Sequence, residues 1–116
     1  MTSNAQAFLS FSVTKCRDES GCIVLRARVH GDCYLYASIG LNGGCCILAR
    51  KLAGHHALVT VRVNGVVLGF VATAKARSRT SIGIAIPLRY RGIFHRGEVV
   101  EVRLRQIEGD GHGGFA

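Results

Sequence analysis

An Asn-Gly pair between two runs rich in β-branched residues is the feature that most constrains how this chain folds. Asn64 and Gly65 separate two alternating apolar runs, which predicts a β-hairpin with a two-residue turn. Such a turn sets Val63 opposite Val66 and thereby fixes the register of both strands. Alternation then places these residues on one face: Val59, Val61, Val63, Val66, Leu68, Phe70 and Ala72. We expect that face to be buried.

The same alternation continues beyond the hairpin. The apolar face is extended by Ala74, Ala76, Ile82, Ile84, Ile86, Leu88 and Tyr90. The opposite face carries Lys75, Arg77 and Arg79, and later Arg89 and Arg91. A spacing of two between cations opposite apolar residues predicts half-buried strands with a charged outer face.

Further strands are expected at 7–14, 22–29, 33–38 and 99–107. The second has Ile23, Leu25, Ala27 and Val29 inward, and the last has Val100, Val102 and Leu104 inward. Residues 45–53 have helical spacing and end near Gly54, which predicts a short helix, with a strand through 45–49 as the alternative. Pro87 is expected at a strand end or a bulge. The fold class is therefore all-β: a small β-barrel or strongly coiled antiparallel sheet with one short helix.

The 116 residues suit a single domain, 1–116, with flexible ends at 1–6 and 108–116. The sequence has no secretory signal and no apolar run of roughly 18 residues, so we expect a cytoplasmic protein without a membrane partner. Five cysteines would be free thiols there. The preference for Arg over Lys, with abundant Cys, also suits a GC-rich or hyperthermophilic source, where intracellular disulfides occur. In that case Cys16 and Cys22, which flank a turn, are the candidate pair.

A net charge of +8 narrows the choice of partner. Such a balance attracts polyanions: nucleic acid first, then acidic lipid or acidic protein. The alternative is a basic protein with no anionic partner.

Four Arg-x-Arg triplets recur at strand spacing, so the two guanidinium groups of each triplet share a face. The planar guanidinium fork suits phosphate, and such contacts position a protein without reading sequence. The candidate nucleic-acid-binding residues are Lys75, Arg77, Arg79, Arg89, Arg91, Arg62, Arg26, Arg28, Arg103 and Arg105. The alternative is an ordinary solvated strand face, with Glu98, Glu101 and Glu108 pairing with several arginines.

Aromatic residues that could stack on bases are few. Tyr34 and Tyr36 are available, whereas Tyr90 falls on the apolar face. The pattern therefore does not favour a stacking platform for single strands.

Residues 80–105 contain Ile-Ala-Ile-Pro, an Arg four residues past the proline, a Gly-Glu pair and then Val-x-Val: Ile84, Ile86, Pro87, Arg91, Gly97, Glu98, Val100 and Val102. At these positions the segment resembles the AbrB/MazE type of swapped-hairpin β-barrel. The resemblance implies a cytoplasmic, dimeric DNA-binding or antitoxin-like protein whose basic residues precede the Ile-Pro element. Lys75, Arg77 and Arg79 occupy that upstream region.

Candidates for metal binding and catalysis are sparse. The cysteines form no C-x-x-C, so buried thiols are the simpler interpretation of Cys45 and Cys46 beside His55 and His56. The same four residues hold the one Cys-His combination close in sequence, and the acids form no convincing pair. The stretch 41–44 lacks the ending of a P-loop and is expected to be a plain turn. We expect no enzyme activity, no metal and no cofactor.

The main hypothesis is a small basic nucleic-acid-binding protein that contacts phosphates, with DNA favoured, through Arg and Lys on strands. The alternative is a non-enzymatic structural or protein-interaction β-barrel module that forms a homo-oligomer.

Overall fold

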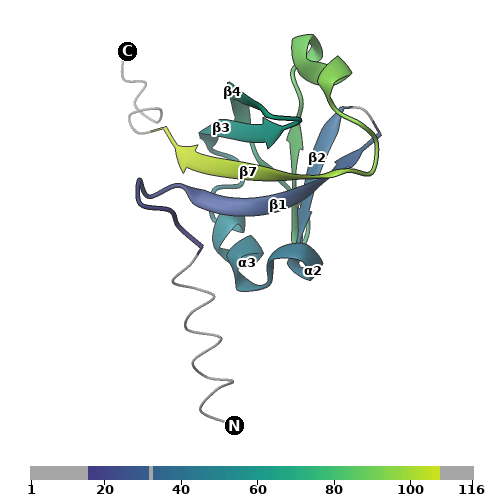
Figure 1. The fold of residues 1–116 in the computed structure, drawn as a ribbon. Coiled ribbons are helices and arrows are strands. Elements are labelled where there is room, and N and C mark those ends of the chain that lie inside the picture. The colour runs from purple at the N-terminus through teal and green to yellow at the C-terminus, as the bar shows by residue number, and fades with distance from the viewer. Residues whose placement is uncertain (1–15, 32, 108–116) are drawn as a thin grey trace, which may run out of the picture.

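The computed structural model describes residues 16–31 and 33–107, and in them antiparallel strands form one curled sheet (Figure 1). The order across the sheet is β4-β3-β7-β1-β2-β6-β5. The elements, in chain order, are β1 (Ile23–His30), β2 (Tyr34–Ser38), α2 (Ile39–Asn42), α3 (Gly44–Arg50), β3 (His56–Val63), β4 (Val66–Thr73), β5 (Lys75–Ser78), β6 (Ser81–Ala85), the 3-10 helix η1 (Leu88–Ile93) and β7 (Val99–Gln106). This confirms the predicted all-β class with a short helical segment. The strand expected at 7–14 and the ends 1–6 and 108–116 lie outside the described residues.

The hairpin forms where it was predicted. Val63 pairs with Val66, and Asn64 and Gly65 have φ angles of 52° and 76°. Positive φ at both turn residues is the geometry that matches the right-handed twist of the flanking strands. The expected inner residues are buried, with Ala72 half-buried. Val66 is the exception, at 45% exposed, although its cross-strand partner Val63 is buried.

The curl of the sheet arises in the chain from Val66 to Ser78. β4 pairs with β3, whereas β5, the next strand along the chain, pairs with β6 at the other edge of the sheet. Ala74 lies between them and is buried. The two edges of the sheet are therefore consecutive parts of one bent stretch, and the sheet wraps around its apolar side chains.

The core is built by alternation, as expected for β1 and β7. All seven residues that were expected to point inward from these two strands are buried: Ile23, Leu25, Ala27, Val29, Val100, Val102 and Leu104. Arg26 and Arg28 point outward and are exposed. Removal of these apolar side chains from water is the main force that holds the sheet in its curled form.

The predicted alternation fails within β5 and again after β6. Ile82, Ile84 and Ile86 are buried, but Ala76 is exposed beside a register shift between Ala76 and Ser78. Pro87, at the strand end as expected, precedes η1. Proline has no N–H to give to a sheet ladder, and its fixed φ suits the start of a helical turn.

Three residues after Pro87 therefore do not lie where the alternation placed them. Leu88 is 77% exposed, although it was expected inside. Arg89 and Arg91 stand on a 3-10 helix, so the prediction that they share a strand face is wrong.

The pairing registers reveal two similar halves. Arg28 pairs with Tyr36, and 47 positions further along the chain Lys75 pairs with Gly83. Each half runs strand, strand, helical segment, strand: β1-β2-α2/α3-β3 and β4/β5-β6-η1-β7. Equivalent strands pair with each other across the halves, β2 with β6 and β3 with β7. The halves are thus related by a pseudo-twofold axis that passes close to the Tyr36–Gly83 pair.

The helical segment between β2 and β3 packs at one end of the sheet. α3 begins one residue before the predicted 45–53 and ends at Arg50, and its Cys46 and Ala49 are buried. The side-chain amide of Asn42 in α2 donates to the backbone carbonyl of Arg26 and accepts from its N–H, which ties α2 to β1.

A disulfide joins Cys16 to Cys45 in α3. The predicted Cys16–Cys22 pair is therefore wrong, and Cys22 is a free, half-buried thiol. The register explains this: Arg17 bridges Ile23, and Val24 donates its N–H to the Cys16 carbonyl, so Cys16 lies opposite Val24.

We expect the double variant Cys16→Ser/Cys45→Ser to lower the free energy of unfolding by about 3 kcal/mol. The bond closes a loop with a sequence separation of 29, and loops of this size carry roughly that chain-entropy effect. Urea unfolding under oxidising conditions measures it. Cys33→Ser, a half-buried free thiol, is the control and should leave the midpoint nearly unchanged. Equal stability of the double variant and the parent protein would contradict the assignment.

Candidate nucleic-acid interface

The strongest convergence of predicted site residues lies on the outer face of β1, β2, β6 and β5. The registers place Arg28, Tyr36, Gly83 and Lys75 in one row across these four strands. Neighbouring strands lie about 4.8 Å apart, so the two ends of the row are about 14 Å apart measured along the curled sheet. Two of the predicted basic segments, distant in sequence, therefore share one surface.

A second row lies beside the first. His30 pairs with Tyr34, and the guanidinium carbon of Arg77 lies 5.2 Å from the centre of the Tyr34 ring. Gly83 makes room for this arrangement, because a Cβ there would come within 3.0 Å of the Arg77 Cγ and Cδ. We call these residues the β1–β5 face: Arg28, His30, Tyr34, Tyr36, Lys75 and Arg77.

The two tyrosines have defined partners. The ring of Tyr36 lies 5.9 Å from the ring of His30, and its hydroxyl accepts a hydrogen bond from the Ser81 hydroxyl at 2.9 Å. Both tyrosines are half-buried on the outer side of β2. In the sequence both rings are available for stacking, but aromatic residues are too few to favour a stacking platform. The alternation of Tyr34 and Tyr36 within a short strand is the signal that they share a face.

The pseudo-twofold relation accounts for the balance of the charges. The offset of 47 makes Arg28 equivalent to Lys75 and His30 equivalent to Arg77. Each half of the chain thus supplies a cation to either end of the central row. The face is a symmetric electropositive strip centred on Tyr36 and Gly83.

The cations of the face are not neutralised by the described acids. None of the carboxylates in residues 16–31 and 33–107 lies within 4.0 Å of the side-chain nitrogens of Arg28, Lys75 or Arg77. Arg28 donates to the Gly97 carbonyl at 2.9 Å, which fixes its guanidinium. An open depression of about 550 Å³ lies there, and Arg96 joins Arg28 and His30 in its lining.

The β3–β7 side of the sheet is different. Arg103 donates to Asp18 at 2.6 Å and to Glu101 at 3.0 Å, and Arg62 lies 3.7 Å from Glu101. Arg26 is directly opposite Glu101 in the register. Three of the predicted phosphate-binding residues therefore adjoin the protein's own carboxylates.

The remaining candidates lie elsewhere. Arg79 is exposed in the turn between β5 and β6. The guanidinium of Arg89 lies 4.7 Å from the Tyr90 ring centre, and Arg91 donates to the Ile86 carbonyl. The ten predicted residues therefore do not form one patch.

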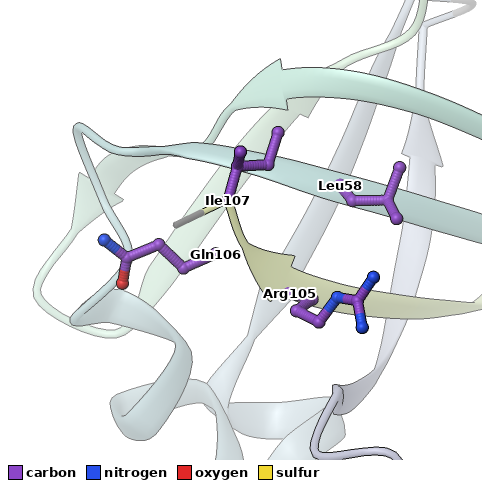
Figure 2. Close-up of a pocket in the computed structure, with 4 residues that line it drawn as sticks. All are labelled: Leu58, Arg105, Gln106 and Ile107. Carbon is purple, nitrogen blue, oxygen red and sulfur yellow. The ribbon is translucent and has the colours of Figure 1, made fainter. Parts of the chain in front are cut away.

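Arg105 lines a depression of a different kind (Figure 2). About 430 Å³ in volume, it is also lined by Leu58, Gln106 and Ile107. Leu58 and Arg105 are cross-strand partners on β3 and β7. With one cation and largely apolar walls, this depression lacks the converging groups found on the β1–β5 face.

The cysteines and histidines considered for metal binding or catalysis have other partners in the structure. Cys45 is in the disulfide, and burial raises the pKa of Cys46 against the opposing effect of Arg50. His56 bonds Thr73 at 3.0 Å through its Nδ1. In the part of the chain that the structure describes, no three His, Cys, Asp or Glu side chains cluster as metal ligands would.

No helix among the described residues has the length and apolar character needed to cross a membrane. Comparison of the chain with protein-family models, with curated proteins and with solved structures finds no match. The case for a function therefore depends on the geometry of the surface.

We expect Asp18→Asn to reduce stability at neutral pH and to lose that effect in acid. The pKa of Asp18 falls from 3.8 to about 2, chiefly because the Ser20 hydroxyl donates to it, with further bonds from backbone N–H groups and Arg103. A carboxyl whose pKa is lowered by folding stabilises the protein above its unfolded pKa and ceases to do so as pH falls through the folded value.

The difference in melting temperature between the parent protein and Asp18→Asn should therefore shrink between about pH 4 and pH 2. Glu19→Gln is the matched control, since Glu19 is an exposed neighbour with no ion pair among the described residues. A difference that is constant with pH would contradict the role given to Asp18.

Proposed function

We propose that this chain binds nucleic acid through the β1–β5 face, with Arg28, Lys75 and Arg77 contacting phosphates. The observation that carries the proposal is the symmetric placement of cations from both halves on one surface, none of them within 4.0 Å of a described carboxylate. Electropositive surfaces of this kind supply the sequence-independent part of nucleic-acid affinity.

The arrangement of the guanidinium groups suits phosphate. One N–H of Arg28 is bound to the Gly97 carbonyl, which holds the group in place while its other donors remain for a ligand. Arg77 lies over the Tyr34 ring, so its planar edge is oriented before binding. Preorganised cations of this type lose less conformational entropy when a phosphate arrives.

DNA is the first polymer to test. The resemblance of residues 80–105 to the AbrB/MazE family remains a prediction, as does a cytoplasmic location. Both agree with a protein that meets DNA directly.

We expect Arg28→Gln/Lys75→Gln to weaken DNA binding and to lower its salt dependence. Loss of two phosphate contacts should reduce the slope of log affinity against log salt by about 2. Fluorescence anisotropy with a labelled oligonucleotide, at several salt concentrations, measures both quantities.

Lys51→Gln/Arg105→Gln is the matched control, because it removes the same charge from exposed positions outside the face. Equal losses in the two double variants would mean that net charge alone attracts DNA. Absence of binding to DNA and RNA at low salt would end the proposal.

A second candidate function is a homo-oligomeric module, and β4 favours it. Among the described strands β4 pairs with β3 alone, and Val67 and Val71 are 58% and 56% exposed on it. An apolar edge strand of this kind is a template for pairing with a second copy of the chain. Mass measurement should then show a dimer that Val67→Lys converts to monomer, whereas a monomeric parent protein would exclude this candidate.

A further inference from the structure

We infer that the ligand of the β1–β5 face is single-stranded nucleic acid, whose bases stack on Tyr34 and Tyr36. The inference rests on the proposed function and names the form of nucleic acid that the face takes. The juxtaposition that carries it is two outward tyrosine rings set among cations from both halves of the chain.

The two rings are placed as a stacking surface requires. Tyr34 and Tyr36 are two residues apart on β2, so they project from the same side of the sheet about 6.6 Å apart along the strand. Their cross-strand partners on β6 are small, since Tyr34 pairs with Ala85 and Tyr36 pairs with Gly83. β6 therefore places no large side chain of its own beside the two tyrosine rings.

The rings are also prepared for a base. The Ser81 hydroxyl donates to Tyr36, and Arg77 lies over Tyr34, so both side chains are oriented without a ligand. The Arg77 guanidinium covers one face of the Tyr34 ring, and its own planar face extends the surface on which a base can stack, with a cation–π contribution. Phosphates between the stacked bases would then meet Arg28 on one side and Lys75 on the other.

A duplex makes poorer use of this surface. Its base faces are covered by neighbouring pairs, and base edges are read by an element that enters a groove. The β1–β5 face spans four neighbouring strands, β1, β2, β6 and β5, whereas the major groove admits a helix or a two-stranded ribbon. A duplex would therefore engage the charges and leave Tyr34 and Tyr36 without a role.

The test compares three labelled ligands of equal length at one salt concentration: oligo(dT), its duplex with oligo(dA), and an abasic single strand with the same phosphates. We expect oligo(dT) to bind at least tenfold more tightly than the abasic strand, with a similar salt slope. Tyr36→Ala should weaken oligo(dT) binding by about 5- to 150-fold and leave the abasic strand unaffected. Tyr34→Ala should weaken oligo(dT) binding to a similar degree and the abasic strand only slightly, because it also removes the ring that orients Arg77. Tyr34→Phe and Tyr36→Phe should retain most of the affinity, because the aromatic face remains.

A second measurement needs no variant. The chain has three tyrosines and no tryptophan, so stacking at Tyr34 and Tyr36 should quench the intrinsic tyrosine emission with oligo(dT) and much less with the abasic strand. Equal affinity and equal quenching for these two ligands, or tighter binding of the duplex, would overturn the inference and leave the proposed function standing. Failure of all three ligands to bind at low salt would overturn both.

Discussion

The pairing of β2 with β6 is the interaction on which the arrangement of this surface depends. It joins the first half of the chain to the second, with Tyr36 opposite Gly83 at the centre. Because β1 flanks β2 and β5 flanks β6, this one ladder brings Arg28 and Lys75 to the ends of the same row. A one-residue slip would turn the outer side chains of a strand toward the core, so the register is held by the burial of Leu35, Ile82 and Ile84.

Gly83 illustrates how the centre of the row is shaped. A glycine within a strand gives up side-chain packing and costs conformational entropy, so its presence usually marks a close approach. Here the stem of Arg77 crosses the space that a Cβ would need. The absence of a side chain on β6 lets a residue from β5 reach the ring of Tyr34 on β2. The contact between Arg77 and the Tyr34 ring therefore depends on glycine at position 83.

The sequence was sufficient to predict local structure, but not which distant segments pair with one another. The Asn64-Gly65 turn, the buried alternation of β1, β3 and β7, and the position of Pro87 follow from backbone geometry and side-chain period, which neighbouring residues determine. The Cys16–Cys45 bond, the neighbours of β2 and the meeting of β1 with β5 depend on contacts between distant segments. Arg89 and Arg91 were misplaced because alternation was carried through a proline, where the ladder stops. Four Arg-x-Arg triplets could be recognised, but not which of them would face one another.

The positions of the carboxylates distinguish strands whose alternating arginines can form a binding surface from strands whose arginines form an ordinary solvated face. The same period of two places cations on the outside of β1, β5 and β7, and by itself it cannot distinguish a binding surface from an ordinary solvated one. On β7, Arg103 bonds Asp18 and Glu101, so its charge is largely neutralised within the protein. On the β1–β5 face the described acids leave Arg28, Lys75 and Arg77 uncompensated, and such charges repel one another in the folded state. An anionic ligand would relieve that repulsion, and the two tyrosines among the cations support the proposal of a polymer that carries both phosphates and bases.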